Sequence, residues 1–282
     1  AVSVTIDGTT VQATKISDGV WTVTWGTPLS DGECDVQVSA TDAAGNTATQ
    51  SFSFTIDTVL SAPVIAMDAA SDTSTVGDNI TQTVKPTFVV TNVDADVTKV
   101  EVTLNGNTQT LTKDASGNWI YTPETPLADG NWTVEVKVTD AAGNTKQSSL
   151  DFTVDTSIST PTVALDASSD TGDVGDNLTN ETTPTFILSN IDPDVTSVMV
   201  TLNGETHSAT KDEQGNWTYT PETALSDGSW TLKVKVTDGA GNTAESSLDF
   251  TIDSTLSTPT VMMDTDSDTA TAGDNITRDT TP

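Results

Sequence analysis

Carboxylates are crowded into one short stretch of the chain, between residues 166 and 177. Asp166, Asp170, Asp173 and Asp176 fall within eleven residues, with Ser, Thr and Asn between them and no Lys or Arg nearby. Like charges at this density repel one another unless water or a cation separates them. Carboxylate and amide oxygens at short, irregular spacing suit Ca²⁺, which takes about six to eight oxygen ligands. The stretch therefore predicts either a solvated acidic loop or a calcium site.

The same acidic frame occurs three times, which favours calcium over a solvated loop. Ser-Asp-Thr followed by Gly-Asp-Asn begins at Ser71, Ser169 and Ser267, so the copies lie 98 residues apart. A fixed register of carboxylates is what a repeated metal site requires. The loop residues that we predict to bind Ca²⁺, or to lie beside it, are Asp72, Asp78, Asp170 and Asp176.

The 98-residue period runs through the whole chain and sets its expected domain organisation. Ala-Gly-Asn begins at Ala44, Ala142 and Ala240 without insertions between the copies. We place each boundary after the recurring Phe-Thr-x-Asp segment. The predicted parts are a partial unit at 1–57, whole units at 58–155 and 156–253, and the start of a further unit at 254–282.

One whole unit has the pattern of short β-strands joined by turns. Residues 132–138 alternate apolar and polar side chains, and Asn105-Gly106 is a strong signal for a tight β-hairpin. No segment has a helical period. Strands are expected at 63–67, 87–91, 100–104, 108–111, 119–121, 132–138 and 148–154. This pattern predicts an all-β chain of tandem seven-stranded immunoglobulin-like β-sandwiches, arranged end to end as a rod.

The links between the units are short, so the ends of neighbouring units are expected to meet. The last strand of one unit ends at Asp155 and the next begins by Pro161. About five residues leave no room for a flexible gap. Acidic residues would then face each other at each joint, where a cation could clamp them. The predicted ligands there are the linker residues Asp57, Asp155 and Asp253 and the turn residues Asp140 and Asp238. A turn Asp that bonds only its own loop backbone is the alternative.

Composition and charge exclude several classes of partner. Lys and Arg number 10 against 41 Asp and Glu, a formal net charge of −31. This charge excludes a nucleic-acid or anionic-membrane surface and favours divalent cations. No apolar run is long enough to span a membrane, and no signal peptide opens the chain, so membrane insertion is not expected. The single cysteine, Cys34, aligns with Trp132 and Trp230 and is predicted to fill the core.

A catalytic site is not expected. His207 is the only histidine, and its counterparts in the other copies are Gln109 and Val11. Acid pairs that could hydrolyse glycosides occur only in the repeated turns, where a structural role is more common. Among the tryptophans, Trp25 alone lacks a counterpart, because Pro123 and Pro221 hold its place, and it is the one candidate for an exposed aromatic. The sequence therefore predicts a non-enzymatic chain.

A family resemblance rests on four recurring motifs, Phe-Thr-x-Asp before a Pro-led strand, Ser-Asp-Thr with Gly-Asp-Asn, Leu-x-Asp-Gly, and Thr-Asp-x-Ala-Gly-Asn. Together they resemble the bacterial immunoglobulin-like domains of giant surface adhesins exported by type I secretion. The resemblance covers the whole chain and implies tandem β-sandwiches with Ca²⁺ at and between the domains. It also implies a secreted or cell-surface protein with a role in virulence. The first copy departs from the pattern at Ile16, Trp25 and Cys34.

The function expected from these observations is a calcium-rigidified segment of an adhesin that attaches bacteria to host epithelial cells. Its partners would be neighbouring immunoglobulin-like domains of the same chain and, through the parent adhesin, host cell-surface glycans or receptors. Two alternatives stay open from the sequence. One is a glycan-binding tip module, and the other is an accessory β-sandwich of a polysaccharide-active enzyme.

Overall fold

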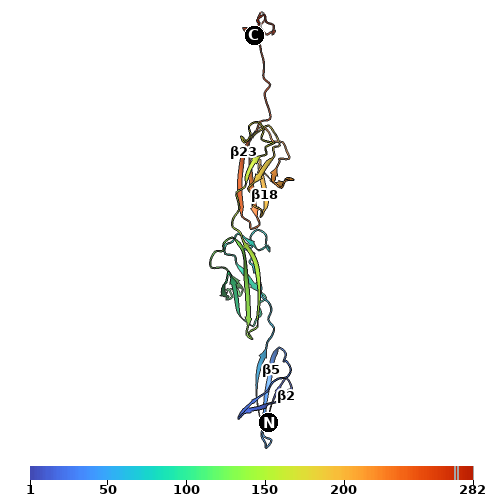
Figure 1. The fold of residues 1–282 in the computed structure, drawn as a ribbon, viewed down its shortest axis with the longest axis vertical. Helices are drawn as coiled ribbons and strands as arrows, with labels where there is room; N and C mark the ends of the chain where they lie inside the picture. The colour runs from blue at the N-terminus through green and yellow to red at the C-terminus, as the bar shows by residue number, and fades with distance from the viewer. Residues whose placement is uncertain (270, 272, 282) are drawn as a thin grey trace. The chain divides into compact units, whose positions relative to one another are not determined.

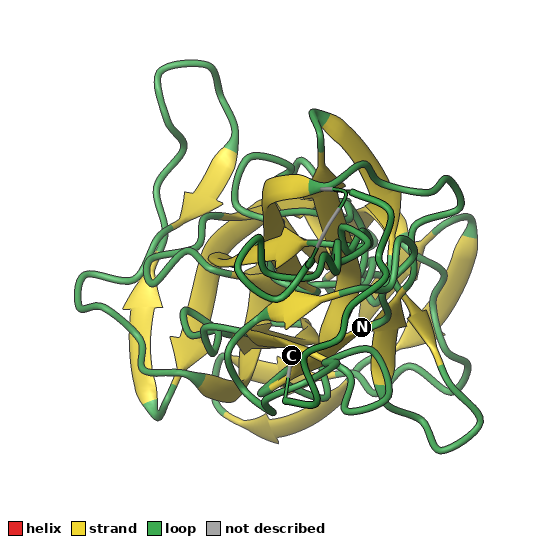
Figure 2. Cartoon of the chain, turned by 90° about the horizontal axis from the view of Figure 1, so that it is seen from above, coloured by secondary structure: helices red, strands yellow, loops and turns green. Residues whose placement is uncertain are grey.

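The computed structural model describes residues 1–269, 271 and 273–281, and these residues form two compact units. The first unit consists of Ala1–Ser157 with Gly239–Asn242, and the second of Ile158–Asp238 with the described part of Thr243–Pro282. Figure 2 shows that strands and loops make up the described chain. No helix able to cross a membrane occurs in this part of the chain. The all-β prediction is thereby confirmed.

The N-terminal part of the first unit is one antiparallel sheet with a separate small hairpin (Figure 1). The sheet has the order β2-β1-β5-β6, with β1 (Val2–Ile6), β2 (Thr9–Gln12), β5 (Gly32–Thr41) and β6 (Thr47–Ile56). The hairpin consists of β3 (Thr14–Ser17) and β4 (Val20–Thr22). Asp7 and Gly8 both have positive φ, 49° and 77°, as the tight turn between β1 and β2 requires.

The buried residues of this sheet include the lone cysteine. Cys34 is 2% exposed and packs with Val4, Ile6 and Val36, which confirms its predicted place in the core. Trp25 is partly buried against the same cluster. The side chain that the sequence left as the one candidate for an exposed aromatic therefore packs against the protein.

The rest of the first unit is a two-layered sandwich. One sheet has the order β11-β10-β13-β14-β8, and the other β12-β9-β7. Their strands are β7 (Val64–Met67), β8 (Ile80–Thr81), β9 (Phe88–Thr91), β10 (Val97–Leu104), β11 (Asn107–Thr110), β12 (Trp119–Tyr121), β13 (Gly130–Asp140) and β14 (Thr145–Val154). The seven expected strands are all present, and β8 is an addition that the sequence did not predict.

Alternating side chains build the core between these two sheets. Along β13, Val134, Val136 and Val138 are fully buried, while the residues between them face outward or are partly covered. Phe88 of β9 meets Phe152 of β14 edge to face, with ring centroids 4.9 Å apart. Because side chains alternate between the two faces of a strand, this pattern holds the sheets together and leaves a polar outer surface.

The short strand β8 ties the acidic loop to the sandwich. It pairs in parallel with β14, through Ile80 with Thr153 and Thr81 with Val154. The Thr153 amide donates to the Asn79 carbonyl at 2.9 Å. Thr81 is fully buried, and its hydroxyl donates to the carbonyl of Ser71 in the acidic loop. The loop is therefore held by both backbone and side-chain hydrogen bonds.

The second unit repeats this sandwich. Its sheets have the orders β16-β23-β22-β18-β19 and β15-β17-β21-β20. Its strands are β15 (Thr162–Leu165), β16 (Leu178–Thr179), β17 (Phe186–Ser189), β18 (Val195–Leu202), β19 (Glu205–Ser208), β20 (Thr210–Lys211), β21 (Trp217–Tyr219), β22 (Gly228–Asp238) and β23 (Thr243–Ile252). Phe186 and Phe250 repeat the edge-to-face contact, at 5.0 Å.

We predict that Thr81→Val loosens the attachment of the acidic loop. Valine keeps the volume but leaves the buried Ser71 carbonyl without its hydroxyl donor, at a free-energy cost of about 1–3 kcal/mol. Hydrogen exchange of the amides at 149–155 should then be faster by roughly tenfold. Thr133→Val is the matched control, because the Thr133 hydroxyl bonds Asp151 at the surface. Equal exchange in the two variants would contradict the proposed attachment.

Candidate metal centre

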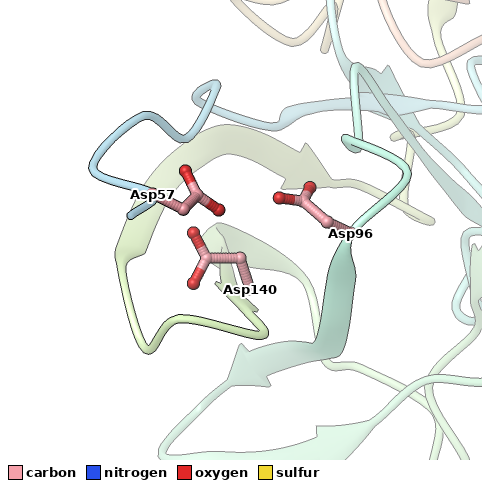
Figure 3. A group of neighbouring side chains, drawn as sticks. All are labelled: Asp57, Asp96 and Asp140. Atoms are coloured by element: carbon pink, nitrogen blue, oxygen red, sulfur yellow. The ribbon is translucent and has the colours of Figure 1, made fainter. Parts of the chain in front are cut away.

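Three carboxylates that are distant in the sequence converge in the first unit. Asp57 follows β6, Asp96 precedes β10, and Asp140 is the last residue of β13. One oxygen of each side chain lies within 4.8 Å of the others. Figure 3 shows the three carboxylates pointing toward a common space, one from the linker after β6 and two from the following sandwich.

The three carboxylates differ in how far they are exposed to solvent. Asp140 is 3% exposed, Asp57 is partly buried, and Asp96 lies at the surface. No ion pair among the described residues involves any of the three carboxylates. Three negative charges therefore face one another without a basic side chain, and a cation could enter from the Asp96 side.

A tight turn fixes the orientation of Asp140. The Asn144 amide donates to Asp140 Oδ1 at 2.8 Å, and Asn144 Nδ2 donates to Asp140 Oδ2 at the same distance. Gly143 has a φ of 94°, which a residue with a Cβ rarely adopts. Asp140 thus bonds its own turn, which is the alternative that the sequence left open. It also faces the two other carboxylates.

Asn144 also joins the turn to the linker. Its Nδ2 donates to the backbone carbonyl of Asp57 at 3.0 Å. Nearby, Asp94 Oδ2 accepts the amide of Ser61 at 2.7 Å. These bonds hold the linker against the sandwich, and they determine where the Asp57 carboxylate lies relative to Asp140.

The net effect of the surroundings is to raise the pKa of Asp57. The Val59 amide, which donates to Asp57 Oδ1 at 3.2 Å, acts in the opposite direction and lowers the pKa. Partial desolvation and the neighbouring carboxylates Asp96 and Asp140 outweigh it, so that the pKa lies above its ordinary value. The ionised form of Asp57 is thus disfavoured at this place unless positive charge is supplied.

Asp140 shifts in the opposite direction. Partial desolvation, the largest influence on it, raises its pKa, but the hydrogen bonds from Asn144 and from the amides of Gly143 and Ala142 outweigh that effect. The pKa of Asp140 is therefore lowered, and the side chain stays ionised. A hard divalent cation would favour the ionised form of Asp57 as well. Each of the two carboxylates could then offer it two oxygen ligands.

Asp96 was not among the ligands predicted from the sequence. It lies in the loop before β10, at residues 92–96. The signal was available, because Asp194 stands 98 residues later in the equivalent loop. The sequence does not show which of the two aspartates in this loop points toward Asp57 and Asp140. Asp94 accepts the Ser61 amide instead.

The predicted ligands of the acidic loops lie apart from this cluster. Asp72 is 5% exposed, and its Oδ2 accepts the Gly77 amide. Its Oδ1 is buried without a hydrogen-bond partner among the described residues, as are the equivalent oxygens of Asp170 and Asp268. A buried carboxylate oxygen without a partner is unfavourable, so this atom is a place where water or a cation would fit.

Asp78 and Asp176 have a more local role. Asp78 Oδ1 accepts the Ile80 amide and Asp176 Oδ1 accepts the Leu178 amide, each at 2.9 Å. Both side chains are exposed. Each thus forms a turn just before the short parallel strand, and their binding of metal stays a prediction.

The three remaining ligands predicted from the sequence are related to the cluster by the repeat. Asp155 and Asp253 are equivalent to Asp57, and Asp238 is equivalent to Asp140. Asp155 and Asp238 belong to different compact units. Metal binding by these residues also stays a prediction from the sequence.

A comparison with known families gives a match over nearly the whole chain. A family model described as "Bacterial Ig-like domain" matches residues 1–58, 59–156 and 157–254. No curated protein sequence matches this chain.

Three solved structures illustrate the structural likeness. The fibronectin(III)-like modules of Clostridium thermocellum CbhA are 16% identical with a TM-score of 0.42, covering 71% of this chain and 100% of theirs. A 1.5-MDa bacterial ice-binding adhesin is 24% identical with a TM-score of 0.38, covering 89% and 84%. A Ca²⁺-stabilized adhesin of an Antarctic bacterium is 27% identical with a TM-score of 0.35, covering 89% and 64%. At these TM-scores the likeness says nothing about what this chain binds.

We predict that Asp96→Asn lowers the pKa of Asp57 in calcium-free buffer. The substitution removes one of the negative charges that disfavour the ionised Asp57 side chain. The measurement is an NMR titration of the Asp57 carboxyl carbon. Asp78→Asn, which changes the charge equally but outside the cluster, should leave this pKa unchanged. The same pKa for Asp57 in wild type and Asp96→Asn would show that the carboxylates do not interact.

Proposed function

The chain belongs to the bacterial Ig-like domain family, and we propose that it is a calcium-stabilised, non-enzymatic segment of a secreted or surface-held adhesin. The proposal rests above all on the cluster of Asp57, Asp96 and Asp140. In this arrangement carboxylates from a linker and from the following sandwich face each other with no basic residue between them.

A bound Ca²⁺ would neutralise charge that otherwise pushes the linker away from the sandwich. Asp57, Asp96 and Asp140 would supply hard oxygen ligands, and water would fill the remaining positions. Asn144 positions two of the ligands, because its Nδ2 bonds both Asp140 Oδ2 and the Asp57 carbonyl. The linker would then be fixed to the β7–β14 sandwich, and bending at this point would be restricted.

Further calcium positions are proposed in the acidic loops. The unpartnered Oδ1 atoms of Asp72 and Asp170 support this assignment. Asp78 and Asp176 are proposed as ligands or close neighbours because the Gly-Asp-Asn motif repeats with them. By the same repeat we keep Asp155, Asp238 and Asp253 as proposed ligands.

The net charge of −31 supports a role outside the cell. Strong self-repulsion opposes compaction of the chain where free calcium is scarce. Extracellular calcium modules bind at about 0.1–1 mM, so the ion becomes available on export. Binding of metal then supplies folding free energy at the place where the protein acts. This order of events fits type I secretion followed by folding at the bacterial surface.

The proposed biological role is attachment to host epithelial cells and so virulence. The recurring motifs resemble those of the giant non-fimbrial adhesin of Salmonella, and this resemblance supports the proposed role. Host cell-surface glycans or receptors are the proposed partners of the parent adhesin. Neighbouring Ig-like domains are the proposed partners within the chain. Labelled protein applied to epithelial cells, with and without calcium, tests whether this segment itself contacts the host.

Asp57→Asn and Asp96→Asn should each weaken calcium binding. Both substitutions keep the side-chain volume while removing a charged ligand, and we expect the affinity of this site to fall by roughly tenfold or more. Isothermal titration calorimetry measures the affinity. Asp18→Asn is the control, because Asp18 lies at the surface beside Lys15 and outside every predicted site. Calorimetric curves identical to wild type in both variants would contradict the metal centre.

Calcium should also stiffen the chain. Small-angle X-ray scattering in calcium is expected to give a larger and better-defined maximum dimension than in chelator. The difference should shrink in Asp57→Asn, because its linker is no longer clamped. An equal maximum dimension in calcium and in chelator would remove the proposed clamp.

The contribution of Asp57 to the pH dependence of stability should reverse when calcium is added. Without calcium, the raised pKa of Asp57 means that the folded state holds a proton more firmly than the unfolded state. Stability from this group is then present at low pH and is lost as pH rises through the folded pKa. With calcium, protons compete with the metal, so stability should fall as pH drops through that range. The measurement is the difference in thermal unfolding between wild type and Asp57→Asn, in chelator and in calcium, because Asp140 and other carboxylates with lowered pKa values contribute equally to both proteins.

A further inference from the structure

In each complete sandwich the larger sheet ends, on one side, in a short strand with an open edge. β11 is the terminal strand of the sheet β11-β10-β13-β14-β8, and β19 holds the same place in the second unit. Both strands are exposed along their whole length, pair with their neighbour without a bulge, and contain no Lys, Arg or Pro. Open edges are usually protected by Lys, Pro or a bulge. Only the four-residue length of these strands therefore limits pairing along them.

Alternate residues of β11 direct their backbone groups away from the sheet. The Leu111 amide donates to the Val100 carbonyl at 2.8 Å. In an antiparallel pair the hydrogen bonds to the neighbouring strand come from every second residue. Thr108 and Thr110 therefore turn their N–H and C=O groups outward, where an added strand could bond them.

The edge strand of the second unit has the same geometry. The Ala209 amide donates to the Val198 carbonyl at 2.9 Å, in the same register as in the first unit. Thr206 and Ser208 are therefore the residues of β19 that face outward. Equivalent positions thus offer free backbone groups in both sandwiches.

A groove lies beside each open edge, between the edge strand and the segment that begins at the end of β12 or β21. The first groove has a volume of about 450 Å³, and its walls include Gln109, Tyr121 and Glu124. The second has a volume of about 410 Å³. Residues at the equivalent positions line it, namely His207, Tyr219 and Glu222.

The carboxylate in each groove lacks a positively charged partner. No ion pair among the described residues involves Glu124 or Glu222. Lys85 lies near the first groove, but its Nζ donates to the backbone carbonyl of Glu124 at 2.5 Å. Thr183 stands at the equivalent place in the second unit. Each groove therefore presents a negative charge that is free to bind a cationic group.

The tyrosine in each groove stays neutral beside this carboxylate. Burial, and after it the charge of Glu124, raises the pKa of Tyr121 above its usual value. Burial and then the charges of Glu222 and Glu205 raise the pKa of Tyr219 in the same way. A neutral phenol and a carboxylate both offer oxygen acceptors, which suit the N–H donors of a guanidinium or ammonium group.

We propose that β11 and β19 each bind a basic, extended segment of another protein as an added strand, with an Arg or Lys side chain of that segment in the groove. The outward backbone groups of the edge strand would bond the segment, and the glutamate of the groove would select its basic side chain. The inference goes beyond the calcium-stabilised role proposed above, because no proposed calcium ligand lines either groove.

Charge complementarity favours this occupant over two others. The net charge of −31 attracts a basic partner and opposes a second copy of this chain. A neutral saccharide could bond the polar walls of the groove. It would leave the carboxylate without a counter-charge and the open strand edge without a partner.

Fluorescence anisotropy with a synthetic peptide tests the proposal. The probe is a labelled, end-capped peptide in which Thr and Arg alternate over about six residues, the length of an ordinary strand. It should bind the whole chain in calcium, and more weakly as salt is added. The same peptide with Gln in place of Arg should bind roughly tenfold more weakly. Equal binding of the Arg and Gln peptides would overturn the proposal.

Methylation of the peptide backbone separates strand addition from general attraction between charges. N-methyl groups on alternate residues of the Arg peptide block the amides along one of its two edges. Because only one edge of an added strand pairs with the sheet, the two alternately methylated peptides should differ in affinity by roughly tenfold. Equal affinities would show that the peptide is held by its charge alone.

Glu124→Gln combined with Glu222→Gln removes the charge of both grooves. This double variant should bind the Arg peptide roughly tenfold more weakly and the Gln peptide as wild type does. Glu33→Gln combined with Glu135→Gln is the matched control, because it changes the net charge equally at exposed positions outside the grooves. Calorimetry should give the same calcium affinity in both double variants, so that a failure of the grooves is distinguished from a failure of the calcium sites.

NMR locates the bound peptide on the chain. The amide signals of Thr108, Thr110, Thr206 and Ser208 should shift most when the Arg peptide is added. Shifts centred elsewhere, or no binding of the peptide, would overturn the proposal. Displacement of the peptide by a neutral glucan oligosaccharide would also overturn it and would assign the grooves to a saccharide.

Discussion

Repulsion among Asp57, Asp96 and Asp140 is the constraint on which the rest of the first unit depends. The three carboxylates come from a linker, a loop and a strand end, and one oxygen of each lies within 4.8 Å of the others. Hydrogen bonds from Asn144 hold Asp140 ionised and anchor the Asp57 carbonyl, so the linker cannot simply swing away. The raised pKa of Asp57 is the electrostatic consequence. The proposed Ca²⁺ would relieve this repulsion.

Closure of the sheet edge is the second determinant of the architecture. In each complete sandwich a two-residue parallel strand, β8 or β16, lies along the last long strand and carries a fully buried or nearly fully buried threonine. Because that threonine bonds the carbonyl of Ser71 or Ser169, the acidic loop and the sheet edge are held by one and the same residue.

Much of the fold could be predicted from the sequence, and less of the site. Period-two alternation and the Asn-Gly and Asp-Gly turns located the long strands, because side-chain direction in a strand depends on local geometry alone. Cys34 was placed in the core by its register with Trp132 and Trp230. Strand β8 escaped prediction, since two residues carry no period. Asp96 escaped because its role depends on Asp57 and Asp140, which lie 39 and 44 residues away.

The amino-acid sequence by itself determined the all-β class, the 98-residue copies, the excess of negative charge and the presence of acidic residues in most of the loops that repeat. The tertiary structure alone decided which of those carboxylates meet. Asp94 and Asp96 are two residues apart, yet one bonds the Ser61 amide and the other faces Asp57 and Asp140. The spacing of residues in a sequence gives only their separation along the chain. The electrostatic interaction between two carboxylates depends on their separation in space, which is set only when the loops pack in the folded protein.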